Sequence, residues 1–135
     1  MKIPLLLPPL LMLAACAGRE VPYAPTQNVR YAALGEAPFW TVTIGDDSIV
    51  LALGADSGAG EGRLESFTYP RVLPSTQAGV TRWESGEGTS VISVEARRER
   101  CPGSRGMAYE DRVTVSLSGR RLEGCGGRIV ERGSR

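Results

Sequence analysis

The chain has 135 residues, 41% of them hydrophobic and 23% charged, with a formal net charge of +1. Lys2 is the one lysine, so the basic residues beyond it are all Arg, and they balance the 15 Asp and Glu. This neutral balance argues against nucleic acid as a partner. The chain has no histidine, which excludes a Ser-His-Asp triad, a Cys-His pair and a His-ligated zinc site. We therefore expect one small globular domain that is not an enzyme and holds neither cofactor nor metal.

Residues 1–15, MKIPLLLPPLLMLAA, carry one positive charge, then a short apolar run, then two alanines. The run is too short to span a bilayer, and this order is typical of a secretory signal peptide. The next residue, Cys16, completes a Leu-Ala-Ala-Cys that resembles the lipobox of bacterial lipoproteins. That resemblance implies cleavage before Cys16 and acylation of the cysteine, which gives stable membrane anchoring. Ala17 implies, by the sorting rule of enterobacterial lipoproteins, an outer-membrane anchor facing the periplasm.

Residues 16–32 contain two prolines and no apolar periodicity, which predicts a flexible tether behind the lipid. A β-domain is expected at 33–131 and a short tail at 132–135. Within the domain, short alternating apolar runs separated by turn residues predict antiparallel strands. The predicted strands are 39–44, 48–53, 63–70, 80–85, 89–99, 112–118 and 120–130.

The segments between these strands carry turn residues. Asp46 and Asp47 are expected in a polar hairpin turn, 54–62 in a glycine-rich turn, and 101–111 in a loop. No stretch has a helical period. The predicted fold class is therefore all-β, a small antiparallel meander or partly closed barrel with one disulfide.

That disulfide follows from the cysteines that remain once Cys16 is assigned to the lipid. Cys101 and Cys125 lie in an oxidising compartment, where two cysteines predict one bridge. Two free thiols or a metal pair are the alternatives, and the spacing and lack of other soft ligands disfavour a metal. The bridge closes a loop of about 25 residues and contributes roughly 3 kcal/mol by the chain-entropy model.

The segment 101–109, CPGSRGMAY, is the candidate binding loop, because a loop held by a disulfide loses little entropy on binding. The residues that it would present are Ser104, Arg105, Gly106, Met107 and Tyr109. The alternative is a plain hairpin loop whose Tyr109 packs over the core, and the sequence leaves both open.

Two further groups of residues are ambiguous. Phe39 and Trp40 either belong to the core, which we favour, or line a binding groove. The arginines of 97–105 either grip an anionic group or form a solvated face, and the interleaved Glu95 and Glu99 favour the solvated face.

The domain resembles a family of small bacterial envelope lipoproteins, which sometimes occur beside a META domain and have no established activity. The family shares a Gly-x-x-Pro-Phe-Trp opening, a mid-domain cysteine leading into a Met/Ser/Tyr loop, and a Gly-Cys near the C-terminus. The matching residues are Gly35, Pro38, Phe39, Trp40, Cys101, Met107, Tyr109, Gly124 and Cys125. Gly103 stands where the family usually has Asp.

A shorter resemblance is to lipoprotein inhibitors of C-type lysozyme, which place a Ser-Gly-x-x-Tyr loop in the lysozyme cleft. Gly106 and Tyr109 match that spacing, with Arg105 in the serine position and Ser104 one residue earlier.

The expected function is a lipid-anchored, non-enzymatic binding or envelope-maintenance module. Its expected partners are the membrane, through Cys16, and an envelope protein. The alternative is inhibition of C-type lysozyme through 101–109. A further alternative is an enzyme that uses carboxylates for catalysis, but the spacing of its candidate residues does not bring them together at one site. Those residues are Asp46, Asp47, Glu110 and Asp111.

Overall fold

The structure is a computed structural model that describes residues 28–54 and 64–133. Over these ranges the chain forms nine strands and one short 3₁₀ turn, η1 (Ser104–Gly106). The first four strands are β1 (Tyr31–Glu36), β2 (Phe39–Ile44), β3 (Ser48–Gly54) and β4 (Leu64–Pro70). The other five are β5 (Ser75–Gln77), β6 (Val80–Glu87), β7 (Ser90–Pro102), β8 (Ala108–Leu117) and β9 (Arg120–Glu131). The all-β prediction is confirmed.

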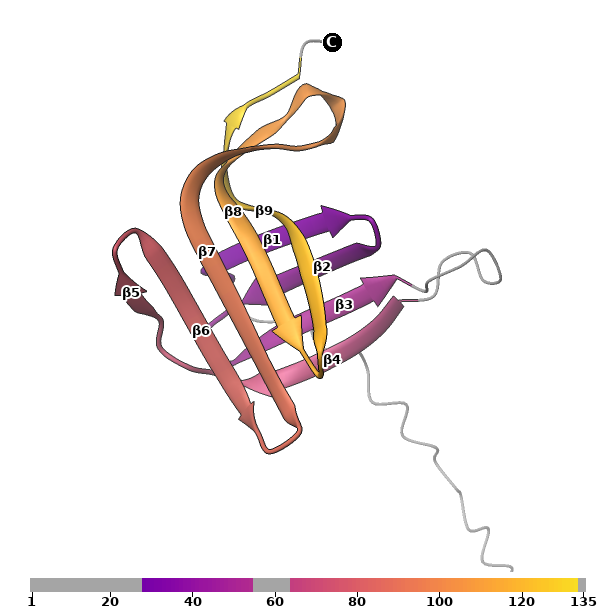
Figure 1. Ribbon diagram of the computed structural model, residues 1–135, viewed down its shortest axis with the longest axis vertical. Helices are drawn as coiled ribbons and strands as arrows, with labels where there is room; N and C mark the ends of the chain where they lie inside the picture. Colours follow the sequence, from indigo (N-terminus) through magenta and orange to yellow (C-terminus); the bar gives the residue numbers. More distant parts are fainter. Residues whose placement is uncertain (1–27, 55–63, 134–135) are drawn as a thin grey trace, which may run out of the picture.

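The strands form one antiparallel sheet in the order β4-β3-β2-β1-β9-β8-β7-β6-β5. The pairing of β1 with β9, through Ala33 opposite Gly126 and Leu34 opposite Cys125, joins the two halves of the chain. Figure 1 shows the sheet curling round, so that β4 and β6 approach each other. The fold is therefore an up-and-down meander that curls into a barrel and stays open between β4 and β6.

The core lies on the inner face of this curled sheet. Successive side chains of a strand point to opposite faces, so one residue in two along β2 is buried, whereas on β3 the five residues 49–53 are all buried. On β2 and β3 the pairing sets Val42 opposite Leu51 and Ile44 opposite Ile49. The largest fully buried side chains are Trp40, Ile49, Leu51, Ile92, Val42, Val94, Val113 and Val115.

The polar hairpin turn between β2 and β3 is confirmed. The Gly45 N–H donates to the Ser48 carbonyl at 3.0 Å, which closes the turn. Asp46 accepts hydrogen bonds from the Arg30 guanidinium, at 2.7 Å from Nε. The Arg30 hydrogen bond is the main reason that the pKa of Asp46 lies below its usual value. The aspartate is thus a turn residue held by an ion pair.

The structure differs from the predicted elements in three places. It adds β1 and β5, because β1 is rich in Ala and Gly and β5 is wholly polar, so neither shows apolar alternation. β1 begins at Tyr31, two residues before the expected domain start. The loop predicted at 101–111 shrinks to 103–107, because β7 continues to Pro102 and β8 begins at Ala108.

Several predicted features lie outside the described residues. They are the signal peptide, Cys16, the tether as far as residue 27 and nearly all of the glycine-rich turn. Among the described residues, no helix is long and apolar enough to cross a membrane.

Candidate functional site

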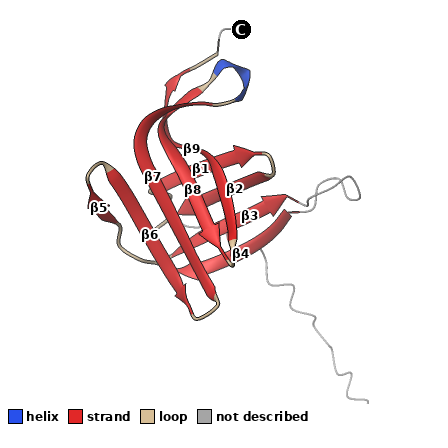
Figure 2. Ribbon diagram, in the orientation of Figure 1, coloured by secondary structure: helices blue, strands red, loops and turns tan. Residues whose placement is uncertain are grey.

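β7 and β8 continue past the body of the sheet and, with the end of β9, form a projection. We call residues 99–109 and 127–131 the tongue. Figure 1 shows the tongue curling over one end of the barrel, and Figure 2 shows η1 at its tip. The sequence predicts most of β7 and β9 but a loop at 101–111, so it predicts neither the strand pairing of the tongue nor its bend.

The bend is produced by irregular pairing on both sides of Glu110. On β7 the pair Arg98–Asp111 is followed by Cys101–Tyr109, so two residues of β7 lie opposite one residue of β8. On β9 a similar shift separates the residues that pair with Asp111 and Tyr109. An extra residue in one strand of a pair bends that strand and raises its twist. Two such shifts at one level turn the three strands out of the sheet together.

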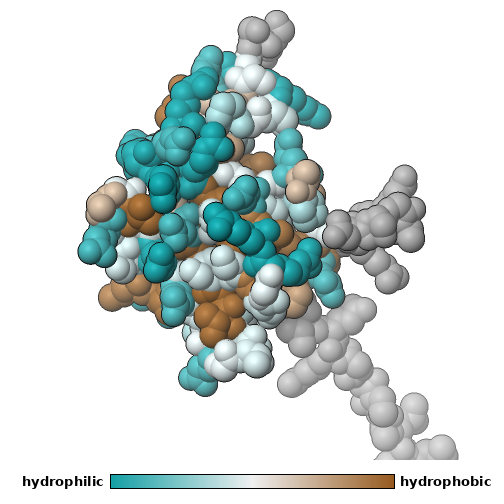
Figure 3. All heavy atoms as spheres, in the orientation of Figure 1, coloured by the Kyte–Doolittle hydropathy of each residue, from teal (hydrophilic) through white to brown (hydrophobic). Residues whose placement is uncertain are grey.

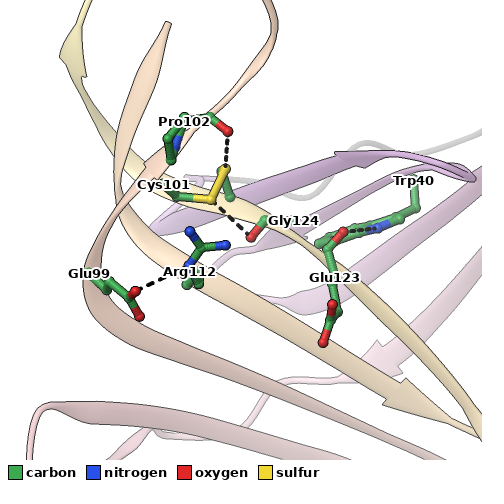
Figure 4. The surroundings of a disulfide bond; sticks show 8 residues. Trp40, Glu99, Cys101, Pro102, Arg112, Glu123 and Gly124 are labelled. Carbon is green, nitrogen blue, oxygen red and sulfur yellow. Dashed lines mark hydrogen bonds and ion pairs between the residues drawn. A yellow bond between two sulfur atoms is a disulfide. The ribbon is translucent and has the colours of Figure 1, made fainter.

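The predicted disulfide crosses this bend. Cys101 and Cys125 are bonded, with Cα atoms 5.5 Å apart, and both are buried. The bond joins β7 to β9, which are not neighbours because β8 lies between them. Figure 4 shows the two sulfur atoms between these strands, above Arg112 of β8 and its ion-pair partner Glu99. The disulfide therefore ties the base of the tongue to the body of the barrel.

The tip of the tongue is a short closed turn. The Gly103 N–H donates to the Met107 carbonyl at 2.7 Å, and the Met107 N–H donates to Ser104 at 3.1 Å. Arg105 and Gly106 both adopt the left-handed conformation, with φ of 55° and 71°. Ser104, Arg105 and Gly106 are exposed. These three residues are the part of the predicted binding loop that the fold exposes at the surface.

The other two predicted loop residues, Met107 and Tyr109, are half-buried. The Tyr109 ring lies so close to Gly103 that a Cβ on Gly103 would be 3.0 Å from the ring. Tyr109 also pairs with Ile129 of β9. Gly133 packs against the outer side of the tip, where a Cβ would lie 2.0 Å from the Arg105 carbonyl oxygen. Tyr109 and Gly133 thus both pack against the tip, and Tyr109 is not itself at the tip.

A polar cluster of Tyr31, Arg98, Glu110, Asp111 and Arg128 lies at the bend. Asp111 is buried and accepts hydrogen bonds from the Tyr31 hydroxyl and from Arg98 Nε, each at 2.8 Å. Glu110 lies 3.9 Å from Arg98 and 3.4 Å from Arg128. The two carboxylates and two guanidinium groups balance in charge, so the cluster holds the bend without leaving a buried charge unpaired.

The pKa values of two groups of this cluster, Tyr31 and Glu110, are shifted away from neutral pH. Burial, followed by the hydrogen bond to Asp111, raises the pKa of the Tyr31 phenol above its usual range. The backbone N–H of Arg128, followed by the nearby guanidinium charges, lowers the pKa of Glu110. At pH 7 the phenol is protonated and Glu110 is ionised. Neither group is poised to exchange a proton, so the cluster gives no support to a carboxylate enzyme.

The sequence contained a signal for this cluster that the loop prediction obscured. On β8 the inward residues are Leu117, Val115 and Val113, and the next position in that row is Asp111. On β7 the inward row of Ile92, Val94 and Ala96 continues to Arg98, which pairs directly with Asp111. Extending both rows by two residues places an ion pair at one end of the core.

The adjacent aromatics Phe39 and Trp40 lie on opposite faces of β2. Trp40 is 1% exposed, and its indole N–H donates to the Glu123 carbonyl at 3.3 Å (Figure 4). Phe39 is 46% exposed, so the core interpretation is correct for Trp40 and wrong for Phe39. Successive residues of a strand face opposite ways, and only one of the two can reach the core.

Two glycines of the resemblance motif explain how the indole fits. A Cβ on Gly35 would lie 2.1 Å from the Trp40 nitrogen, and one on Gly124 would lie 2.0 Å from the Leu34 carbonyl oxygen. Cys125 follows Gly124 and carries the disulfide. Residues far apart in the sequence thus meet at one packing point where β1, β2 and β9 adjoin. In this chain the motif serves the packing of the barrel.

The arginines of 97–105 differ in their partners. Arg97, Arg98 and Arg100 each pair with a carboxylate, which agrees with the mixed-charge interpretation. Arg105 forms no ion pair with any residue that the structure describes. Its guanidinium at the tip is therefore available to an anionic group.

In the described ranges, 28–54 and 64–133, no group of His, Cys, Asp and Glu side chains could hold a metal ion. Comparison with known proteins gives no match to a family model, a curated protein or a solved structure.

Proposed function

We propose that the chain is a lipoprotein of the bacterial envelope, anchored through Cys16 and facing the periplasm, that binds a partner through the tip of the tongue. The observation that carries this proposal is a projecting tip closed by its own backbone hydrogen bonds, on a tongue whose base the Cys101–Cys125 disulfide ties to the barrel. A site whose residues are already ordered loses less entropy on binding than a free loop. The disulfide also supports an oxidising compartment, as the signal peptide does.

The chemistry of the tip favours a partner with an acidic patch. Arg105 is exposed and lacks an ion-pair partner among the described residues, and Ser104 beside it offers a hydroxyl. Val130, 55% exposed, adds an apolar contact on the same projection. Figure 3 shows hydrophilic surface over much of the tongue with smaller apolar patches among it. A guanidinium that recognises a carboxylate beside an apolar contact is a common arrangement at protein interfaces.

The test is site-specific photo-crosslinking in the cell envelope. A crosslinking side chain at Ser104 should give a defined protein adduct, and Arg105→Glu in the same chain should remove it. The matched control is Ser118, an exposed serine in the β8–β9 turn. If both positions give the same adducts, or if Arg105→Glu has no effect, binding through the tip is refuted.

The anchor and the lysozyme alternative have separate tests. A Cys16→Ser chain should leave the membrane fraction, and one that stays there after normal cleavage would contradict the lipid anchor. C-type lysozyme is a defined partner on which the tip can be tried directly. Stoichiometric inhibition that Arg105→Ala weakens would identify the partner as lysozyme, whereas no inhibition at micromolar excess would remove that alternative.

A further inference from the structure

The described structure has a cavity where the barrel fails to close. It is a cleft of about 750 Å³ between β4 and β6, lined by 66–70 and Val72 on one side and by 84–87 and Ser90 on the other. The Ser85 hydroxyl donates to the Pro70 carbonyl at 2.5 Å, so one hydrogen bond joins the two sides of the cleft. A run of consecutive residues on each side means that the backbones of two strand edges form its walls.

Both edges are uncovered over this length in the part of the chain that the structure describes. β4 pairs with β3 on one side and with no strand on the other. β5 covers β6 at Val80–Arg82 and then ends, so 83–87 has a partner on the β7 side alone. An uncovered edge presents backbone N–H and C=O groups that can pair with another strand. Five residues of extended chain span about 17 Å, the length of such an edge.

The inner wall of the cleft is aromatic. Phe67 and Tyr69 are on the face of β4 whose partners on β3 are the core residues Leu51 and Ile49. Tyr69 is 9% exposed, but Phe67 is 36% exposed because the barrel is open beside it. Burial raises the pKa of Tyr69, which therefore stays neutral at pH 7. An apolar side chain of a bound strand would cover the Phe67 ring.

The charged residues that line the cleft are acidic, and one basic residue, Arg71, stands in the chain between the lining residues Pro70 and Val72. Glu84 and Glu87 line it, Glu65 precedes its first residue, and none of the three forms an ion pair with a described residue. Most other carboxylates of the described sheet do pair with arginine. Those in ion pairs are Asp46, Glu95, Glu99, Glu110, Asp111, Glu123 and Glu131. The lining contains no basic residue.

We infer that the β4–β6 cleft is a second binding site, which takes an extended segment of another protein with alternating basic and apolar residues. The segment pairs as a strand with an open edge, in the manner of β-augmentation. Its apolar side chains cover Phe67, its Lys or Arg side chains on the other face lie toward Glu84, and Glu87 stands at the end of β6. The inference stands apart from the tongue, which lies at the bend of β7–β9.

A second copy of this chain fits the cleft poorly. Pairing through the same edges would place Glu65, Glu84 and Glu87 of one copy beside those of the other. Like charges set across a shared edge cost free energy, and acidic edges are a known device against self-association. The same charges attract a basic segment, so charge selects the partner.

The test is fluorescence anisotropy with labelled peptides and the full chain in a nonionic detergent. The probes are blocked Val-Lys-Val-Lys-Val and its Val-Glu-Val-Glu-Val counterpart, and two forms of the lysine peptide methylated on its Val or on its Lys amides. The protein variants are Glu84→Gln/Glu87→Gln and Arg105→Ala. Glu36→Gln is the matched control, since Glu36 is exposed, forms no ion pair with a described residue and lies outside the cleft.

The lysine peptide should bind and the glutamate peptide should not. The double glutamine variant should weaken binding roughly three- to tenfold, as expected for the loss of two solvent-exposed ion pairs. Glu36→Gln and Arg105→Ala should leave the affinity unchanged, and at least one methylated peptide should lose binding because a backbone hydrogen bond is blocked.

Four results would overturn the inference. One is equal binding by the double glutamine variant, and another is undiminished binding of both methylated peptides. A third is no binding of the lysine peptide, with or without dimerisation of the chain. The last is loss of binding in Arg105→Ala, which would place the peptide on the tongue. Failure of the tongue proposal in crosslinking leaves this test unaffected, so the two sites stand or fall separately.

Discussion

Removal of the disulfide by Cys101→Ala/Cys125→Ala should lower the free energy of unfolding by about 3 kcal/mol. The two cysteines are 24 residues apart, and the chain-entropy model assigns about this stabilisation to a bridge that closes such a loop. Alanine avoids leaving reactive thiols, and Cys16→Ser in both proteins removes the third cysteine. For a domain of ordinary stability, 5–15 kcal/mol, the loss is large but leaves the barrel folded.

The assay is urea denaturation followed by tryptophan fluorescence, combined with amide hydrogen exchange. Because the bond joins the tongue to β9 across the bend, exchange should rise most in 99–109 and least in β2 and β3. A loss below about 1 kcal/mol would refute the entropic argument. Unchanged exchange in the tongue would show instead that the polar cluster alone holds the bend.

Three further predictions concern the core, the hydrogen bond between the two sides of the cleft, and the bend. Trp40→Ala should lower the free energy of unfolding by about 3–5 kcal/mol in urea denaturation, because it leaves a cavity in the core, whereas Phe39→Ala should lower it by under about 1 kcal/mol. Equal losses would contradict the assignment of Trp40 to the core and Phe39 to the surface. Ser85→Ala should lower the free energy of unfolding by about 1–3 kcal/mol, since the Pro70 carbonyl loses its hydrogen-bond donor. An unchanged free energy of unfolding would show that this hydrogen bond does not hold β4 to β6. Glu110 has a pKa in the folded state below its unfolded value, so its stabilisation is present above the unfolded pKa of about 4.3 and is lost as the pH falls through the folded pKa. Denaturation at a series of acidic pH values should therefore show a shallower loss for Glu110→Gln than for the parent, and parallel curves would refute the assignment.

The regular part of the fold was predictable because each barrel strand with apolar alternation has one solvent-exposed and one buried face. The alternating rows through Val42, Val94 and Val115 mark the strands and the side that faces the core, whereas β3, with 49–53 all buried, shows no such alternation. The disulfide was predictable from cysteine count and compartment. Strands without alternation, such as β5, carry no such signal, because their pairing is decided by the neighbour that they cover.

The bend of the tongue was not predictable from the same reasoning, because a β-bulge depends on pairing across three strands. Glu110 sits opposite two residues on each side, and nothing in the local sequence of β8 marks that count. On β9 the bulge has one local sign, Gly127, whose φ of 75° is a conformation that glycine adopts at β-bulges. The polar cluster could have been predicted, because Asp111 continues the inward row of β8. The loop predicted at 101–111 includes Asp111 and therefore hides it.

Both proposed sites arise where the chain departs from a closed, regular barrel. Closure between β4 and β6 would pair the open edge of β4 and leave the short β5 as the one edge of the described sheet. Here β5 covers only part of β6, and Glu84 and Glu87 stand beside the part left open. If those carboxylates served only to prevent aggregation, their neutralisation would promote self-association without altering affinity for the lysine peptide. If they also recognise a partner, self-association rises and affinity for the lysine peptide falls in the same variant. Analytical sedimentation of Glu84→Gln/Glu87→Gln, together with the anisotropy titration, therefore distinguishes protection of the edge against aggregation from recognition of a partner.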